Sequence, residues 1–367
     1  MRVTRLGLRD FRNYARAEVE LGPGLTVICG PNGAGKTNLL EGLYFGLTGR
    51  SCRTANEREV VRAGATLTRA TAGTADGDGE HLIEVGHEPG EAKRLRVDGA
   101  LVERLSDSPA RPLVSVFLPD RLELVKGAPA GRRAHVDHFV AALWPARAET
   151  RSLYARAMAQ RNAELARVRA GTSGGRQLDV WDAELARHGV QLMADRSAAA
   201  EELAPRFERL AGELGLPTPA ELAYRPRSPA ADAEALRLEL AERRDEDLAR
   251  GFTTHGPHRD DLRLRLAGRA LRSHGSQGQQ RQSLLTLLFA ERELLAERGR
   301  PPLMLLDDVM SELDAERRRR LTELVRAGGQ ALITATEPEQ VPGAGDPDVL
   351  LLWVEGDRVS MPVGTAA

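Results

Sequence analysis

Lysine is scarce in this sequence. Lys36, Lys93 and Lys126 are the only three, so 49 of the 52 cationic residues are arginine. Most of the positive charge therefore resides on guanidinium groups, which bind phosphate and carboxylate in a bidentate manner. The formal net charge of -1 argues against a protein that coats nucleic acid uniformly, but it leaves room for a local basic patch.

Cysteines and long apolar runs are also few. The chain of 367 residues has two cysteines, Cys29 and Cys52, and it opens on an alternating strand pattern instead of an apolar leader. We therefore expect no signal peptide and a reducing, cytoplasmic setting. No window reaches the ~18 to 20 apolar residues of a membrane span, so we expect no membrane partner.

Two kinds of pattern divide the chain. Both ends contain short apolar runs separated by turns, such as Leu25–Cys29 and Leu303–Leu306, which predict strands. The middle has helical spacing rich in alanine, arginine and glutamate, with breaks at 171–175 and 216–229 and no sustained heptad. The predicted division is residues 1–120 and 251–367 for an α/β domain and residues 121–250 for a compact helical lobe.

A glycine-rich segment joins the strand that ends at Cys29 to a helical pattern. Its residues match G-x-x-x-x-G-K-T and are Gly30, Pro31, Asn32, Gly33, Ala34, Gly35, Lys36 and Thr37. Small residues let backbone N–H groups surround a β-phosphate, while Lys36 would bridge the β- and γ-phosphates and Thr37 would bind magnesium. A chance glycine-rich turn is the alternative, and the flanking strand and helix argue against it. We expect ATP with Mg2+ here.

Two carboxylate residues directly follow the apolar run Leu303–Leu306. Asp307 and Asp308 follow it directly, at the tip of a predicted buried strand. In phosphate-loop proteins such a tip faces the loop, so Asp307 would hold magnesium with Thr37, and Asp308 would orient or deprotonate the attacking water. The alternative is a strand that ends in polar residues before a turn, which the phosphate loop in the same chain makes less favourable.

A second helix start has the composition of an anion site. Ser276, Gly278 and Gln279 provide small and amide residues ahead of a helical run from Arg281 to Leu295. Because the chain already contains one phosphate loop, this segment suggests a site that reaches the nucleotide of a second subunit. A plain N-cap by Ser276 is the alternative.

The order of these motifs resembles that of ABC-type ATPases, in which a signature motif precedes the Walker B carboxylates and a D-loop. The D-loop match is Ser311 and Asp314, in the segment Ser-Glu-Leu-Asp. Within that class the chain resembles the RecF family of DNA-repair ATPases, which are related to SMC heads. The segments that carry this resemblance are Asp10–Tyr14, Gly30–Thr37, Leu122–Gly127, Arg132 and Arg133 with Asp137, Gln160–Ala163, Gly256–Leu262 and Asp307–Asp314.

The resemblance implies an α/β fold, an ABC-type P-loop ATPase head with mixed sheets, plus an inserted helical second lobe. It implies ATP-dependent homodimers in which each nucleotide lies between the phosphate loop of one copy and Ser276, Gly278 and Gln279 of the other. It also implies a role in DNA replication, DNA damage repair and the SOS response, with weak ATP hydrolysis as a dimer switch. The implied partners are double-stranded DNA, single-strand/double-strand junctions, RecR and RecO, and indirectly RecA.

Three features depart from the wider ABC pattern. A late strand ends in Thr334-Ala335-Thr336 where transporters have a switch histidine, so a hydroxyl would sense the γ-phosphate. No glutamine occurs between Thr37 and Gln160, and Asp120 is a candidate substitute for the Q-loop amide. Asp308 is one methylene shorter than the usual glutamate, which predicts slow turnover.

Three further candidates compete with ordinary structural roles. Arg12 is a candidate nucleotide contact, or else a solvated strand residue. His258 lies in a Gly-Pro-His-Arg-Asp-Asp turn and is a metal candidate, although turn-forming residues surround it. The run Arg317–Arg320 is a candidate DNA patch, or else an exposed helix face.

The leading functional hypothesis is an ATP-gated DNA clamp of RecF type. The alternative is an ABC-type ATPase subunit of a transporter or of another motor that does not act on DNA. A P-loop kinase is a third reading, but nothing in the sequence forms an acceptor site, and the Ser276 segment would be unexplained.

Overall fold

A computed structural model describes residues 1–119 and 122–361 of the chain. The chain forms two compact units, and the first combines Met1–Arg121 with Leu295–Ala367 while the second is Leu122–Leu294. Both ends of the sequence therefore contribute to one unit.

The second unit extends well past residue 250, where the sequence pattern placed the end of the helical lobe. Strand β10 (Asp261–Leu266) pairs with strand β9 (Ala220–Arg225), which lies inside the segment assigned to that lobe. This pairing was missed because β9 occupies the stretch 216–229, which reads as a break between helices. The segment at Ser276 accordingly belongs to the second unit.

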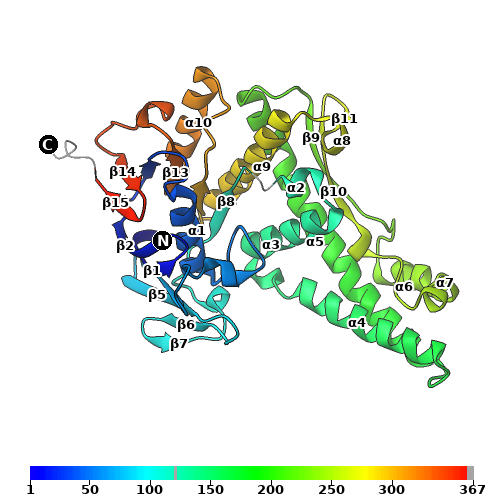
Figure 1. The fold of residues 1–367 in the computed structure, drawn as a ribbon. Coiled ribbons are helices and arrows are strands. Elements are labelled where there is room, and N and C mark those ends of the chain that lie inside the picture. The colour runs from blue at the N-terminus through cyan, green and yellow to red at the C-terminus, as the bar shows by residue number, and fades with distance from the viewer. Residues whose placement is uncertain (120–121, 362–367) are drawn as a thin grey trace. The chain divides into compact units, whose positions relative to one another are not determined.

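The first unit contains a mostly parallel sheet whose core strand precedes the glycine-rich loop. Strand β3 (Leu25–Cys29) is buried at all five positions, as expected for a strand covered on both faces. The other strands of this sheet, coloured from red to cyan in Figure 1, are β15 (Arg358–Ser360), β14 (Leu350–Glu355), β13 (Ala331–Ala335), β12 (Leu303–Leu306) and β8 (Val114–Phe117). Strand β3 pairs in parallel with β13 and β14, and β12 pairs in parallel with β13 and β8.

A second, antiparallel sheet of six strands completes the β-structure of this unit, and we call it sheet A. Its two last strands form a hairpin at Asp98-Gly99, where both residues have positive φ as a type I′ turn requires. The strands in spatial order are β2 (Tyr14–Glu20), β1 (Arg2–Phe11), β4 (Thr68–Ala75), β5 (Glu80–His87), β6 (Arg94–Val97) and β7 (Ala100–Leu101).

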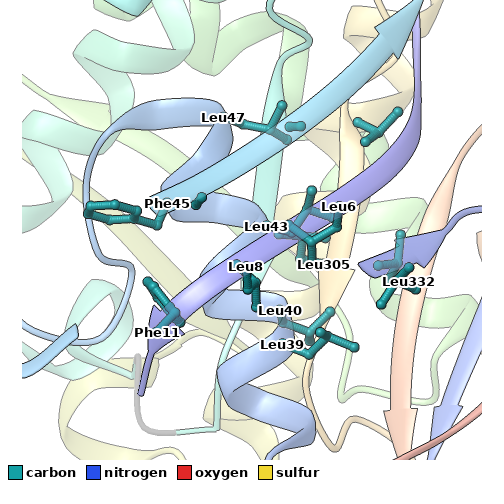
Figure 2. Packing of buried hydrophobic residues seen from close by; sticks show 14 of the residues in the cluster. Leu6, Leu8, Phe11, Leu39, Leu40, Leu43, Phe45, Leu47, Leu305 and Leu332 are labelled. Carbon is teal, nitrogen blue, oxygen red and sulfur yellow. The ribbon is translucent and has the colours of Figure 1, made fainter. Parts of the chain in front are cut away.

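Helix α1 (Lys36–Thr48) contributes to one hydrophobic core with both sheets (Figure 2). Leu39, Leu43 and Leu47 are buried in the same cluster as Leu8 of sheet A and Leu305 of the parallel sheet. A helix that is apolar on several faces is buried rather than amphipathic. The core therefore holds the helix that begins at the phosphate loop.

The second unit is mainly helical. Helix α5 (Gln177–Glu213) runs for 37 residues and packs against α4 (Thr150–Arg169), with the turn between them at the predicted break. The other main elements are α3 (Pro129–Leu143), α6 (Ala233–Glu242), α7 (Arg244–Arg250), α8 (Leu271–His274) and α9 (Gln277–Glu297), with β11 (Arg269–Ala270) beside β10.

Buried ion pairs connect these helices. Arg161 of α4 is fully buried and donates to Asp182 of α5 and Asp247 of α7 at 2.6 Å each, and also to Thr253 at 2.9 Å. The neighbouring Asn162 accepts a 2.8 Å hydrogen bond from the Thr253 backbone N–H. Removing one partner of such a network leaves an uncompensated buried charge, so these residues specify how α4, α5 and α7 pack.

No helix in the described part of the chain is both long enough and apolar enough to span a bilayer.

Close packing between α1 and sheet A generates a prediction at Gly42. A Cβ there would lie 2.7 Å from Cδ2 and 2.8 Å from Cδ1 of the buried Leu8. Overpacking of this kind costs about 1–3 kcal/mol, against a helix-propensity gain of about 1 kcal/mol for replacing glycine. We expect Gly42→Ala to lower the free energy of unfolding by up to about 2 kcal/mol in urea titrations.

Gly46, one turn later on the same helix, is the matched control. A Cβ at this position would meet its nearest neighbour, the Cβ of Ala70, at 3.5 Å, which is an ordinary van der Waals contact. We expect Gly46→Ala to be neutral or stabilising by up to about 1 kcal/mol. Equal effects of the two substitutions would contradict the packing argument.

Candidate functional site

The predicted site residues of the first unit gather at one edge of the parallel sheet. The register aligns the ends of β3, β13 and β12, with Cys29 opposite Ala335 and Ile333 opposite Leu306. The phosphate loop follows β3, and Asp307 follows β12. Ligands of open α/β sheets bind outside the carboxyl ends of parallel strands, so the fold places loop and carboxylates where a shared ligand would lie.

Glycine is required at two positions of the phosphate loop. A Cβ on Gly30, which has φ of 150°, would stand 2.2 Å from the backbone oxygen of Val354 in the neighbouring strand β14. Gly35 has φ of 107°, and its Cβ would lie 2.5 Å from Nδ2 of Asn13. Both positions combine a backbone conformation that favours glycine with a close neighbour. The loop is thus shaped by β14 and by the β1–β2 turn.

Helix α1 begins without a side-chain cap and has no acidic residue in its first turn. Its N-terminal amides and dipole are therefore suited to an anion. Lys36 folds back over the loop, where Nζ donates to the carbonyl oxygens of Gly30 at 2.6 Å and Pro31 at 3.0 Å. Burial lowers the pKa of Lys36, and the charges of Asp307 and Asp308 oppose that effect.

Asp307 is buried and accepts hydrogen bonds from two threonines. The hydroxyl of Thr37 lies 3.0 Å and 2.9 Å from its two carboxylate oxygens, and the hydroxyl of Thr334 donates to Oδ1 at 2.7 Å. Burial raises the pKa of Asp307, and both hydroxyl donors work against that rise. These are hard oxygen donors of the kind Mg2+ prefers, and Mg2+ commonly uses one or two carboxylates together with substrate phosphates.

The structure brings Asp308 to the same edge but leaves its side chain exposed. Its backbone N–H donates to the Thr334 hydroxyl at 2.9 Å, and its φ of 47° is unusual for a residue with a side chain. Ser311 donates to the Asp308 carboxylate at 3.1 Å. Positive φ in a non-glycine residue costs energy and is concentrated at functional sites, which is consistent with a catalytic role for Asp308.

Arg12 is held by a carboxylate that the sequence did not point out. Its guanidinium donates from Nε to Oε2 of Glu41 at 2.9 Å and from Nη2 to Oε1 at 2.7 Å. Ser51 and Arg53 also donate to Glu41, whose side chain is fully buried. A lone acid between Leu40 and Gly42 on an apolar helix was the available signal. Arg12 stays a candidate nucleotide contact, anchored beside the phosphate loop.

The second-unit candidates and the D-loop acid form helix caps. Ser276 accepts from the Gln279 N–H at 3.2 Å, and its own N–H donates to the Gln279 side chain at 2.9 Å, which is a capping box. Gly278 is exposed with open space around it. Asp314 caps α10 (Ala315–Ala327) by accepting from the Arg317 N–H. The N-cap alternative for Ser276 is thus observed, and its role toward a second copy stays a prediction.

Three weaker candidates also have places in the structure. Thr334 is buried between the Asp307 carboxylate and the Asp308 backbone N–H, whereas Thr336 is partly exposed with its hydroxyl 3.5 Å from the Asn32 side chain. The Q-loop candidate Asp120 lies outside the described residues. Both ring nitrogens of His258 have protein partners, namely the Tyr154 hydroxyl and the Thr253 carbonyl, which favours a structural role over a metal site.

Two arginines of α10 pair with acids on their own helix. Arg319 contacts Glu316 and Glu323, and Arg320 contacts Glu323 at 3.0 Å. This arrangement is that of a solvated helix face stabilised by ion pairs one turn apart. It gives the run Arg317–Arg320 an ordinary explanation.

Comparisons with known proteins decide the family. A model of the AAA domain family matches residues 5–106. The chain is 40% identical over 359 residues to the DNA replication and repair protein RecF of Streptomyces avermitilis, covering 94% of this chain and 95% of that protein. The chain belongs to the RecF family. It is also 41% identical to RecF of Anaeromyxobacter sp. strain Fw109-5, over 98% of this chain and 99% of that protein.

Solved structures agree with this RecF assignment. The recombination mediator protein RecF-ATPrS in the RecFOR pathway matches with a TM-score of 0.83 and 26% identity, over 99% of this chain and 98% of that one. An SMC head bound to the C-terminal winged-helix domain of ScpA matches with a TM-score of 0.60 and 15% identity, over 98% and 96%, which shows the fold. The predicted family and the predicted ABC-type head with mixed sheets are confirmed.

The double role of Thr334 generates a prediction. Thr334→Val keeps the shape of the side chain but removes the donor to Asp307 and the acceptor for the Asp308 N–H. Asp307 keeps its hydrogen bond from Thr37, whereas the Asp308 N–H loses its partner, at a cost of about 1–3 kcal/mol. We expect the free energy of unfolding, measured in urea, to fall by about 1–3 kcal/mol.

Thr336→Val is the control, because the Thr336 hydroxyl is partly exposed and, among the described residues, has only the 3.5 Å contact to Asn32. Its effect should stay within about 0.5 kcal/mol, as for most surface substitutions. If Thr334→Val were equally mild, the threonine would not be holding the Asp307 carboxylate and the Asp308 backbone in place.

Proposed function

We propose that this RecF-family chain is an ATP-dependent DNA-binding repair protein that dimerises on ATP and hydrolyses it slowly. In this proposal it binds duplex DNA and gap junctions, acts with RecR and RecO, and thereby helps to load RecA. The carrying observation is that Thr37 of the phosphate loop and Asp307 of the neighbouring strand meet at 2.9 Å. Support for the cellular role comes from relatives described as DNA replication and repair protein RecF.

The site residues divide the work on the nucleotide. The loop amides and the start of α1 would hold the β-phosphate, with Lys36 turning from the loop carbonyls toward the β- and γ-phosphates. Thr37 and Asp307 would hold Mg2+, which when bound neutralises charge that develops on the transferred phosphoryl group. One solved relative is a RecF-ATP structure, at 26% identity and a TM-score of 0.83, which supports ATP as the nucleotide.

Hydrolysis would depend on Asp308 as the group that orients water. Its exposed carboxylate directly follows Asp307, the residue that would hold the metal, and Ser311 of the D-loop segment contacts it. Asp308 reaches less far than a glutamate would, and slow turnover suits a switch between monomer and dimer. In the dimer, Ser276, Gly278 and Gln279 of one copy would close the site of the other.

One sedimentation experiment tests both ATP-dependent dimerisation and DNA binding. In sedimentation with ATP, we expect a homodimer that moves together with a gapped duplex, and this binding should weaken steeply with salt through counterion release. Ser276→Arg should abolish the ATP-dependent dimer while the monomer still binds nucleotide, because a bulky charge would block the trans phosphate site. Light scattering provides the mass.

Ser273→Arg, on another exposed serine of the same segment, should still dimerise. Lys36→Met should instead weaken nucleotide binding itself. A Ser276→Arg protein of dimeric mass with ATP would reject the trans site. A wild-type dimer that does not sediment with the gapped duplex at any salt concentration would favour the transporter or motor alternative.

The catalytic assignment of Asp308 has its own test. Asp308→Asn should bind ATP, accumulate as the dimer and release phosphate at least about 100-fold more slowly in single turnover, since a positioned general base contributes about 10²–10⁴ in rate. Asp346→Asn removes the same charge from a surface ion pair with Arg326 and should hydrolyse at the wild-type rate. Phosphate release by Asp308→Asn at that control's rate would rule out the role.

A further inference from the structure

A row of arginines crosses the outer face of sheet A. The strand register places Arg9 of β1 directly opposite Arg16 of β2 on one side and Arg69 of β4 on the other. Arg69 is in turn opposite Gly86 of β5, which is opposite Arg94 of β6. Five neighbouring strands thus contribute four arginines and one glycine to a single line, which we call the arginine row.

The row faces away from the core. All four arginines are exposed, and the adjacent positions Leu8, Ala70 and Val85 point into the hydrophobic cluster with α1. Because side chains alternate between the two faces of a strand, the burial of these positions fixes the row on the outer face.

The arginine row does not stabilise sheet A. Side chains directly opposite each other on paired strands are close neighbours, and like charges there are destabilising. Arg16 bonds to Glu18 of its own strand at 2.7 Å. Within the described residues, no carboxylate lies within ion-pair distance of Arg9, Arg69 or Arg94.

Several arginines on the helices of this chain are matched with acids. Arg187, Arg237 and Arg319 pair with Glu184, Glu234 and Glu316, respectively, one turn away on their helices. On sheet A itself, the next row contains Glu84, and Arg96 stands opposite it. Three of the four arginines in the row have no such acidic partner among the described residues.

We propose that the arginine row binds the phosphate backbone of duplex DNA. Adjacent strands lie about 4.8 Å apart, so the row spans roughly 19 Å. Phosphates of one DNA strand follow at about 3.4 Å along the helix axis, so the row matches roughly five or six nucleotides. Guanidinium groups bind phosphate in a bidentate manner, and Gly86 leaves the position between Arg69 and Arg94 free of a side chain. The inference rests on the proposed DNA-binding function and assigns it a surface.

The test variant replaces the three uncompensated arginines, as Arg9→Ala, Arg69→Ala and Arg94→Ala together. Binding of a fluorescent 30-base-pair duplex is measured by anisotropy with ATP across a salt series. Each lost phosphate contact removes about 0.9 from the slope of log affinity against log salt, so the slope should flatten by about 2–3. Affinity at about 0.1 M salt should fall at least tenfold.

The control variant is Arg187→Ala, Arg237→Ala and Arg319→Ala together, which changes the net charge equally but removes paired arginines. It should keep the wild-type affinity and slope. ATP binding should be as in the wild type for both variants, and the row variant should melt no lower than the wild type, because removing like charges relieves their repulsion. If the alanine variant were poorly folded, Arg9→Gln, Arg69→Gln and Arg94→Gln would replace it and should show the same loss.

The outcomes separate this inference from the proposed function. If the wild type binds DNA and both triple variants bind it equally well or equally poorly, the arginine row is not the DNA surface, although the proposed function survives. If the wild type itself does not bind the duplex, the proposed function fails. Polyglutamate, measured in the same assay, serves as a probe for an acidic protein partner. If the Arg9, Arg69 and Arg94 variant lost binding to polyglutamate but kept binding to the duplex, the row would be assigned to such a partner and the inference would be overturned.

Discussion

The carboxylate of Asp307 joins three segments of the first unit that are far apart in sequence. Thr37 at the start of α1 and Thr334 at the end of β13 both donate to it, and it closes β12. A buried carboxylate needs such donors, because burial disfavours its charged form and each lost partner is costly. This interaction sets where the phosphate loop lies relative to the strand ends, and the geometry of the whole site depends on it.

A second buried carboxylate, Glu41, performs a comparable task on the other side of the loop. It holds Arg12, which lies in the tight turn between β1 and β2 and has a φ of 53°. Asp10, near the end of β1, also has a positive φ, of 49°. Such conformations persist only where the surroundings fix them. The ion pair to α1 supplies that restraint. The side chains of Asn13 and Tyr14, which follow Arg12, lie where a Cβ on Gly35 would be.

Buried arginines of the second unit connect its helices. Arg161 and Asn162 bind Asp182, Asp247 and Thr253, and Arg196 of α5 reaches Asp137 of α3 and Asp260 before β10. Arg161, Asn162, Asp137 and Asp260 lie in the segments that resemble the RecF family, whereas Arg196 and the partners of Arg161 lie outside them. The rigid fork of donors on arginine suits the buried positions 161 and 196. Some motif residues of this chain therefore fix helix packing, and others gather at the edge of the parallel sheet.

Local patterns determined the strand–loop–helix at Gly30–Thr37, the carboxylates after β12, the hairpin at Asp98-Gly99 and the family. Each depends on neighbours in sequence, such as apolar runs and glycine positions. Only the tertiary structure decided that Glu41 anchors Arg12, that β9 pairs with β10 inside a helical segment, and that Arg9, Arg16, Arg69 and Arg94 align. Strand register and buried pairing join residues tens of positions apart, and periodicity along one segment carries no information about its partner.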